Sequence, residues 1–159
     1  MKITILAVGK IKEKYFTEAI KEYSKRLSRY ATLKIIEVDD EKTPDHAPPA
    51  LEAQIRQREG ERLLKALKDD AYLIALAIDG QSLDSPALAQ TIEKLGVQGH
   101  AHLAFLIGGS LGLSQEVLRK ADLRLSFSKL TFPHQLMRVI LLEQIYRSFR
   151  IIKNEPYHK

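Results

Sequence analysis

The chain has 159 residues, of which 45% are hydrophobic and 28% charged, a composition near the average for globular proteins that fits one domain spanning 1–159. It contains no cysteine, which excludes disulfides, thiolate metal sites and a cysteine nucleophile, and which fits a cytoplasmic setting. The formal net charge of +5 suits an anionic partner such as RNA, although many proteins without such a partner carry a similar excess.

The N-terminal stretch MKITILAVGK predicts a short strand that ends at Gly9. Its apolar run is far shorter than the roughly 18 residues that a membrane span needs, so no membrane association is expected. The next segment, 15–30, repeats apolar residues at helical spacing. The opposite face of this helix carries a basic stripe of Lys14, Lys21, Lys25, Arg26 and Arg29. The stripe is either an ordinary solvated helix face or a surface that contacts RNA.

Strands and helices alternate through the middle of the chain. The run 71–78 (AYLIALAI) is almost wholly apolar, as expected for a central parallel strand buried on both faces, and a turn at Asp79-Gly80 should end it. Ser85-Pro86 predicts a helix N-terminus with Ser85 as the cap. The predicted strands are 3–8, 33–38, 71–78 and 102–107, and the predicted helices between them are 15–30, 50–68 and 85–95. This order predicts an α/β domain with a mostly parallel sheet flanked by helices.

Glycines follow the strand 102–107. In open parallel sheets ligands bind beyond the carboxyl ends of the strands, so the residues after Ile78, Ile107 and Phe127 are the first candidates for a site. The sequence GGSLG at 108–112 lets the backbone approach a ligand closely, although a tight turn would use the same residues. The spacing fits neither a phosphate-binding loop of the G-x-x-x-x-G-K-[ST] type nor a dinucleotide site of the G-x-G-x-x-G type.

A fifth strand is expected at 123–127, followed by the Ser/Thr-rich loop SKLTF. Pro133 can begin a helix, whose free N–H groups would bind an anion or a polar ligand edge. His134 is a candidate base or phosphate contact, but a histidine at a helix start is also commonly structural.

The helix expected from Pro133 to about Lys153 is apolar around most of its circumference, with a narrow polar stripe of Glu143, Arg147 and Arg150. Such a helix should be buried on more than one side, which in so small a domain favours a two-fold homodimer. Arg138 lies within the apolar arc and is expected to meet a carboxylate, a carbonyl or a ligand phosphate, because an unpaired buried guanidinium is costly.

The chain closes with Tyr157-His158-Lys159. Chain ends are usually frayed, yet these three residues offer a stacking ring, an imidazole and a cation that could hold a nucleotide.

Four stretches, MKITILAVGKIKEKY, FLIGGSLGL, LSFSKLTFPHQLMRVILLEQIYR and NEPYHK, together resemble the H family of ribosomal RNA large-subunit methyltransferases, small members of the SPOUT superfamily. The resemblance covers essentially the whole chain. It implies an α/β sheet whose C-terminal part forms a trefoil knot, a rare exception to un-knotted topology. It further implies a homodimer whose site is completed by both subunits, and an enzyme that uses S-adenosylmethionine and no metal to methylate N3 of a pseudouridine in the helix 69 loop of 23S rRNA in the assembled ribosome.

The same resemblance implies the site residues. The cofactor contacts would be Leu76, Gly108, Phe127, Ser128, Lys129, Leu130, Thr131 and Phe132. For the methyl transfer itself, the chemistry of the reaction makes His158 our candidate base or nucleotide contact, with Tyr157 stacking and Arg138 or Lys159 holding phosphate or developing charge.

Two other functions stay open. The chain could be a ribosome-associated RNA-binding dimer without catalysis. A lack of cofactor binding would favour this alternative. It could also be a SPOUT methyltransferase of tRNA or of another rRNA site, although it lacks the extra RNA-binding extension expected there.

Overall fold

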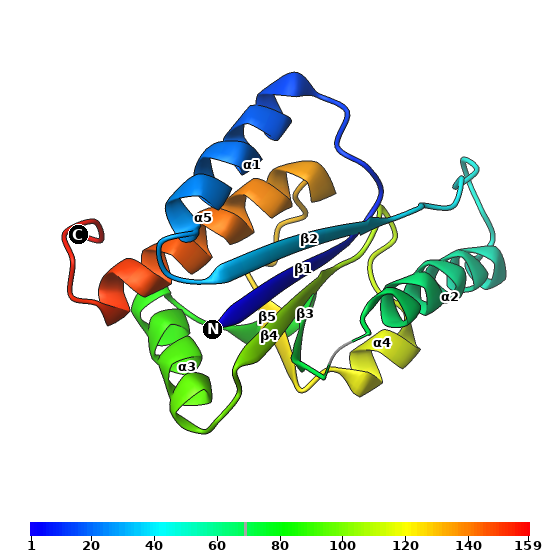
Figure 1. The fold of residues 1–159 in the computed structure, drawn as a ribbon. Coiled ribbons are helices and arrows are strands. Elements are labelled where there is room, and N and C mark those ends of the chain that lie inside the picture. Colours follow the sequence, from blue (N-terminus) through cyan, green and yellow to red (C-terminus); the bar gives the residue numbers. More distant parts are fainter. Residues whose placement is uncertain (69) are drawn as a thin grey trace.

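The computed structural model describes residues 1–68 and 70–159. Five parallel strands form one sheet in the order β2-β1-β4-β3-β5, with helices in the connections (Figure 1). The elements are β1 (Lys2–Val8), α1 (Lys14–Leu27), β2 (Thr32–Val38), α2 (Pro49–Ala66), β3 (Tyr72–Ser82), α3 (Ser85–Val97), β4 (His102–Ile107), α4 (Gln115–Lys120), β5 (Leu123–Ser126) and α5 (His134–Ile152). The predicted α/β class with a parallel sheet is confirmed.

The sheet buries side chains on both faces, because alternate residues of a strand point to opposite sides. In β1, Ile3 and Ile5 join the core beneath α1, α3 and α5, whereas Leu6 and Val8 join the smaller core beneath α2 and α4. Figure 1 shows the same three layers, with α2 and α4 on the face away from α5. A strand covered in this way has to be apolar on both sides, which explains the continuous hydrophobic runs in the sequence.

The strand β3 is longer than predicted. It continues through Asp79-Gly80 to Ser82, and its pairing with β5 shifts between Leu76 and Gln81. A Cβ at Gly80 would lie 2.7 Å from the carbonyl carbon of Arg124, so the absence of a side chain lets the two strands meet again beyond the irregularity. The prediction that the strand ends at Asp79-Gly80 is therefore wrong.

Burial on both faces also holds only for the first half of β3. Ile74 and Ala75 are buried, whereas Ile78 is 52% exposed. The irregularity takes the second half out of the regular ladder and opens it toward solvent.

Three local predictions need correction. The helix α1 ends at Leu27 rather than at residue 30. The cap of α3 is Asp84, whose carboxylate accepts from the Ala87 N–H at 2.8 Å, and not Ser85. The short helix α4 was not predicted, although Ser114 caps it through its hydroxyl, which accepts from the Val117 N–H.

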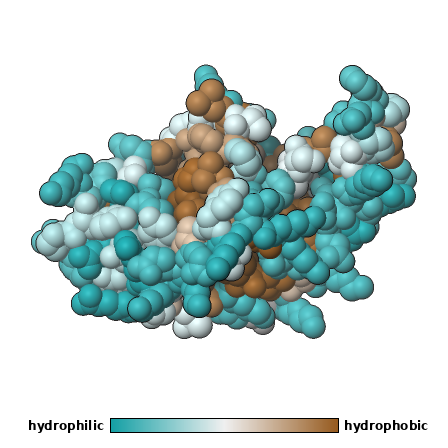
Figure 2. All heavy atoms as spheres, turned by 90° about the horizontal axis from the view of Figure 1, so that it is seen from above, coloured by the Kyte–Doolittle hydropathy of each residue, from teal (hydrophilic) through white to brown (hydrophobic). Residues whose placement is uncertain are grey.

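The helix α5 packs against α1 and α3 within its own chain. This packing buries Leu141, Leu142, Ile145 and Phe149, so a partner subunit is not needed to explain those apolar positions. Met137 and Ile140 remain half-buried. In Figure 2, apolar side chains gather near the middle of one face of the molecule, between hydrophilic margins. The order of the strands in the sheet does not show whether the C-terminal segment passes through a loop of the chain, so the trefoil knot stays a prediction.

None of the helices in the described parts of the chain is both long enough and apolar enough to cross a membrane.

Candidate functional site

A pocket of about 590 Å³ lies beyond the carboxyl ends of β4 and β5, beside the irregular middle of β3 and at the N-terminal end of α5. Its walls come from the segments 76–78, 107–112 and 127–134, except Lys129, together with Leu125 and Met137. Because parallel strands run toward one edge of the sheet, the fold brings together residues that are as far apart in the sequence as Leu76 and His134. The segments after Ile107 and Phe127 therefore meet at one cavity as expected, whereas the residues directly after Ile78 do not line it.

The glycine loop, residues 108–112, forms one wall of this pocket. A Cβ at Gly108 would lie 2.5 Å from the carbonyl carbon of Gly112, closer than real Cβ contacts allow. The loop closes through the Gly112 N–H, which donates to the Gly109 carbonyl at 3.0 Å, and Gly112 has φ +83°. Glycine is required at both ends of the loop, in one case for close approach and in the other for the backbone conformation.

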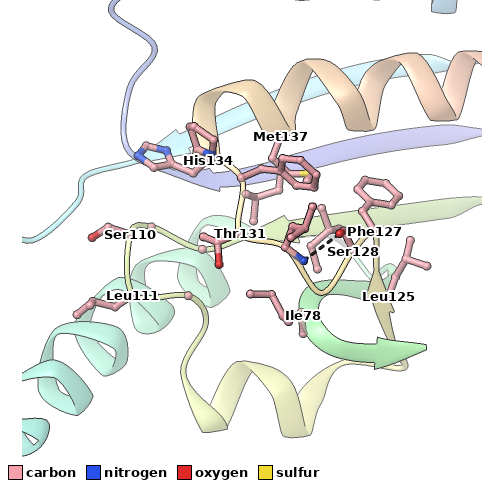
Figure 3. Close-up of a pocket in the computed structure, with 18 residues that line it drawn as sticks. Ile78, Ser110, Leu111, Leu125, Phe127, Ser128, Thr131, His134 and Met137 are labelled. Carbon is pink, nitrogen blue, oxygen red and sulfur yellow. Dashed lines mark hydrogen bonds between the residues drawn. The ribbon is translucent and has the colours of Figure 1, made fainter. Parts of the chain in front are cut away.

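The opposite wall is the loop that follows β5. Ser126 anchors its start by donating from Oγ to the carbonyl of Ile78 at 2.7 Å. Ser128 shapes the next turn, since its Oγ accepts from the Leu130 N–H at 2.9 Å. The Leu130 side chain is 70% exposed beside the cavity. Figure 3 shows Phe127 and Leu125 at one end of the pocket, Ser110 and His134 at the other, and Thr131 between them. The pocket therefore has an apolar end and a more polar end.

His134 is the first residue of α5 and stands at the polar end. Its Nδ1 is buried and has no hydrogen-bond partner among the residues that the structure describes. Burial lowers the pKa of this imidazole from its ordinary value, and the nearby Arg138 guanidinium lowers it further. An imidazole with a buried, unpaired ring nitrogen thus forms part of the polar end of the pocket.

Arg138 lies behind the pocket and does not line it. Its side chain is 2% exposed and is held by Glu37, 2.5 Å from its Nη1, and by the carbonyls of Val8 and Gly9, which accept from Nη2. The expectation that it meets a carboxylate or a carbonyl is confirmed. Because both terminal nitrogens are used inside the fold, the structure gives Arg138 the role of joining α5 to β1 and β2 rather than that of a phosphate contact.

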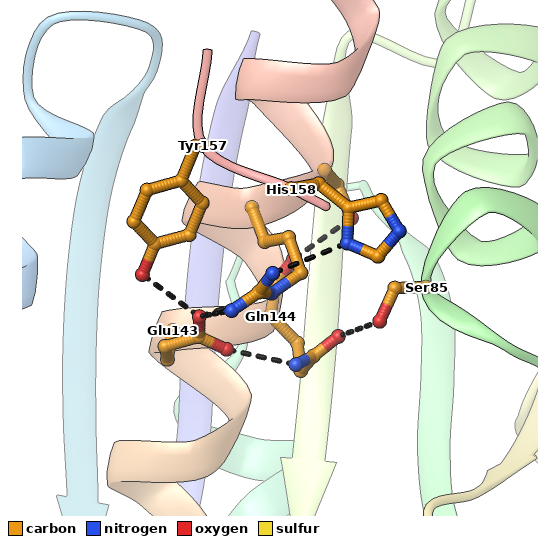
Figure 4. A network of polar contacts seen from close by, with 7 residues as sticks. Ser85, Glu143, Gln144, Tyr157 and His158 are labelled. Atoms are coloured by element: carbon orange, nitrogen blue, oxygen red, sulfur yellow. Dashed lines mark hydrogen bonds and ion pairs between the residues drawn. The ribbon is translucent and has the colours of Figure 1, made fainter.

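The C-terminal tail folds back onto the last turns of α5. The Tyr157 hydroxyl donates to Glu143 Oε1 at 2.9 Å, and the Arg147 guanidinium lies 2.6 Å from the same oxygen and 4.7 Å from the centre of the Tyr157 ring. His158 Nδ1 lies 3.1 Å from Arg147 Nη1. Figure 4 shows Tyr157 joined to Glu143, His158 on the side of Ser85, and Gln144 between Glu143 and Ser85. These contacts define the tail network: Glu143, Arg147, Tyr157 and His158.

The contacts of this network shift the pKa values of Tyr157 and Arg147. Burial and the hydrogen bond to Glu143 raise the pKa of Tyr157 to about 12, so its hydroxyl stays a donor throughout the neutral range. The Glu143 carboxylate raises the pKa of Arg147. A guanidinium only donates, so Nδ1 of His158 accepts from Arg147, and a neutral His158 carries its proton on Nε2.

The pocket lies at the N-terminal end of α5, whereas the tail network begins at Glu143 in the middle of the helix and continues to Arg147. Thirteen residues separate His134 from Arg147, which at ~1.5 Å per residue is about 20 Å along the helix. In Figure 1 the C-terminus lies beside the C-terminal end of α5, which is the end away from the carboxyl ends of the strands. Within one chain the predicted cofactor residues therefore come together, and so do Tyr157 and His158, but the two groups do not meet.

Comparison with known proteins decides the family. The family model described as "Predicted SPOUT methyltransferase" matches residues 1–158. The chain belongs to the SPOUT methyltransferase family. It is 61% identical over its full length to a curated protein of equal span from Bifidobacterium adolescentis named "Ribosomal RNA large subunit methyltransferase H". A Clostridium perfringens protein named "Ribosomal RNA large subunit methyltransferase H 1" is 57% identical, again over the whole of both chains.

The fold also resembles that of a solved structure. The chain superposes with a TM-score of 0.59 on "a probable methylase family protein" from Haemophilus influenzae, at 14% identity and over 99% of this chain and 70% of that one. At this identity the likeness concerns the fold alone.

Sequence reasoning found most of this SPOUT pocket but missed part of it. Seven of the eight predicted cofactor residues line the cavity, and Lys129 does not. Ile78 and Met137 also line it, and neither was named as a cofactor contact. Glu143 and Arg147 were noted only as a polar stripe, although their spacing of four residues is that of a helical ion pair.

No set of three or more His, Cys, Asp or Glu side chains within the described SPOUT domain is arranged to hold a metal ion.

Proposed function

We propose that this chain is an S-adenosylmethionine-dependent methyltransferase that modifies N3 of a pseudouridine in the helix 69 loop of 23S rRNA, in the assembled ribosome. The observation that supports this most is the pocket at the strand ends, which collects seven of the predicted cofactor residues from three separate segments. Sequence identity of 61% and 57%, over the full length, to proteins named as ribosomal RNA large-subunit methyltransferases supports ribosomal RNA as the substrate class.

The pocket fits such a cofactor in size and chemistry. Its volume lies within the range of about 300–1,000 Å³ typical of small-molecule sites. Leu76, Leu125 and Phe127 offer apolar surface for a flat base, and the glycine loop exposes backbone groups without Cβ atoms in the way. Ser110, Thr131 and His134 supply polar groups at the other end. When bound, S-adenosylmethionine supplies an electrophilic methyl group on a sulfonium, which calls for alignment more than for a metal or a covalent enzyme intermediate.

The tail network suits the acceptor nucleotide. N3 of pseudouridine is an imide nitrogen that must lose its proton to become a good nucleophile, and either a base or nearby donors can promote that loss. The hydrogen bond from Arg147 occupies Nδ1 of His158, which leaves Nε2–H free to donate. We therefore favour Arg147 and His158 as donors that stabilise the imide anion, with the Tyr157 ring as a surface for the base. His158 acts as a base only if Arg147 releases its Nδ1.

A homodimer would bring the two parts of the site together. Within one chain His134 of the pocket and Arg147 of the tail network are about 20 Å apart along α5. Pairing two chains around a two-fold axis, with the α5 helices antiparallel, would place the tail of one chain near the pocket of the other. The exposed side chains of Ile78 and Leu130 at the pocket would then be covered.

The α1 helix offers a surface for rRNA. Lys14, Lys21 and Lys25 are exposed on it. The Arg26 guanidinium lies 5.9 Å from the centre of the Tyr146 ring, which in turn contacts Tyr157 edge-on. The basic stripe is thereby continuous with the tail network, as expected of a surface that follows a phosphate backbone to a reacting base. The proposed setting is the cytoplasm, where ribosomes are found.

Two measurements test the proposal. Isothermal titration calorimetry should show saturable binding of S-adenosylmethionine and none of NAD or ATP. Radiolabelled methyl transfer should then occur to assembled ribosomes lacking the modification and not to tRNA or naked rRNA, with the label in a nucleotide whose N3 is blocked. Methylation of tRNA would favour a different SPOUT substrate. Ribosome binding without cofactor binding or transfer would favour a non-catalytic RNA-binding dimer.

A further inference from the structure

The C-terminal tail is ordered by contacts that lie outside the tail network. Chain ends are commonly frayed unless they are held by specific contacts. Here the helix α5 ends with Asn154 in a left-handed conformation, φ 54°. The Asn154 N–H donates to the Ile151 carbonyl at 3.0 Å and the Glu155 N–H to the Arg150 carbonyl at 2.9 Å. This pair of bonds is the Schellman arrangement, which turns the chain sharply back at a helix end.

Side chains then fix the direction in which the tail leaves. Arg150 Nη1 donates to the Tyr30 hydroxyl at 2.9 Å and to Glu155 Oε2 at 2.5 Å, while Nη2 donates to the Pro156 carbonyl at 2.7 Å. The Tyr30 hydroxyl itself donates to Glu155 Oε2 at 2.9 Å. Three groups, from the α1–β2 connection, from α5 and from the tail, thus close a triangle.

The triangle is well supported. The Tyr30 ring stacks on Phe149, with centroids 5.8 Å apart and planes 10° apart. The side chains of Arg150 and Glu155 are 17% and 26% exposed, so their pair is more shielded than an ordinary surface ion pair. A further cation, Arg29, lies 3.9 Å from the same carboxylate oxygen on the exposed side.

We propose that Tyr30, Arg150 and Glu155 form a clamp that holds the tail in place before substrate arrives, and so position Tyr157 and His158 for methyl transfer. The clamp acts through the tail and is not part of the catalytic group itself. It rests on the proposed function, because that function gives Tyr157 and His158 their roles. Two residues after the clamped Glu155, Tyr157 reaches Glu143, and His158 reaches Arg147 next.

The physical reason for such a clamp is the entropy of ordering a chain end. Fixing each tail residue costs backbone entropy, which a free tail would have to lose during the reaction. A tail already ordered in the free enzyme has lost this entropy in folding, so the transition state is reached with less further ordering.

The test compares Arg150→Met with Lys153→Met. Both variants lose one positive charge from the end of α5, but Lys153 is exposed and contributes no contact to the clamp. Backbone ¹⁵N relaxation of residues 157–159 in the free protein should show the order parameter falling from about 0.85 to below about 0.6 in Arg150→Met only. The kcat for ribosomes should fall about tenfold with the KM for ribosomes and the Kd for S-adenosylmethionine within twofold of wild type.

A milder set of variants covers the case in which Arg150→Met unfolds. Tyr30→Phe keeps the stacked ring and removes only the hydroxyl, and Glu155→Gln removes only the charge. Each should lower the order parameters of the tail partly. The fold-loss of kcat in the double variant should be smaller than the product of the two single fold-losses, because both residues act on one triangle.

The outcomes separate the clamp from the proposed function. If the order parameters of the tail in Arg150→Met equal those of wild type, the clamp proposal is wrong. It is also wrong if the tail is loosened and kcat does not change. If the wild-type protein transfers no methyl group to ribosomes, the proposed function fails, and the relaxation data alone then decide whether the clamp orders the tail.

Discussion

The hydroxyl of Tyr157 donates to the carboxylate of Glu143, fourteen positions earlier, at 2.9 Å, and thereby ties the end of the chain to the polar stripe of α5. Burial and this bond raise the pKa of Tyr157 to about 12. The contact joins the two residues that the sequence placed in separate roles, one in the polar stripe and one in the tail.

The first prediction concerns pH and stability. Because the pKa of Tyr157 in the folded chain lies above the value of about 10 for an unfolded tyrosine, the folded state holds this proton more tightly. The stability due to this bond is fully present below about pH 10 and is lost as pH rises toward about 12. Urea unfolding of wild type and Tyr157→Phe across this range should show a steeper decline for wild type. Parallel declines would contradict the shifted pKa.

The second prediction concerns the glycine loop. Gly108→Ala should weaken S-adenosylmethionine binding at least about tenfold, because the new Cβ would meet the Gly112 backbone at 2.5 Å and displace the pocket wall. Gly96→Ala is the matched control, since its Cβ would meet only the flexible end of Met1 at 3.1 Å. Calorimetry of both variants checks the effect, and equal affinities would show that the loop does not shape the site.

The third prediction concerns the buried ion pair behind the pocket. Glu37→Ala leaves the 2%-exposed Arg138 without its carboxylate and should lower the free energy of unfolding by about 3 kcal/mol. Glu22→Ala removes the exposed partner of Arg26 and should change it by less than about 0.5 kcal/mol. Chemical denaturation of both variants measures the difference. A cost for Glu37→Ala as small as that of the control would mean that Arg138 finds other acceptors.

The fourth prediction separates two neighbouring residues of the loop after β5. Leu130 borders the pocket, so Leu130→Asp should weaken cofactor binding about tenfold, because it replaces an apolar side chain at the cavity wall with a carboxylate. Lys129 does not line the pocket, and Lys129→Met should bind within twofold of wild type. A large loss with Lys129→Met would restore its side chain to the list of cofactor contacts.

The fifth prediction tests whether the site forms between subunits. Gly108→Ala should disable the pocket and His158→Ala the tail, so each homodimer should be inactive. After equal mixing and exchange of subunits, half of the dimers are mixed, and each has one site with an intact pocket and an intact tail. Activity should therefore return to about a quarter of the wild-type value per chain. A mixture that stays inactive, with subunit exchange verified by mass spectrometry, would place each site within one chain.

The sequence determined the order of the elements and most of the pocket. Apolar runs such as 71–78 and 102–107 need cover on both sides, so alternating strands and helices leave a parallel sheet as the simple arrangement, and parallel strands bring their carboxyl ends to one edge. Gly108 and Thr131 were predictable as site residues because they follow predicted strands, whereas Phe127 was named through the family resemblance. The family resemblance supplied the chemistry that spacing alone did not.

Only the tertiary structure decided what the side chains do. Nothing local shows that β3 passes through Asp79-Gly80, because the continuation depends on close pairing with Arg124 on another strand. Arg138 was expected to find an anion or a carbonyl, but the choice of Glu37 depends on β2 lying beside β1. The tail shows the same dependence: Tyr30 and Glu155 are 125 residues apart, and their hydrogen bond exists only because α5 packs along α1. Hydrophobic periodicity is a local property and fixes the elements, whereas these polar contacts join distant parts of the chain and form only after the elements have packed.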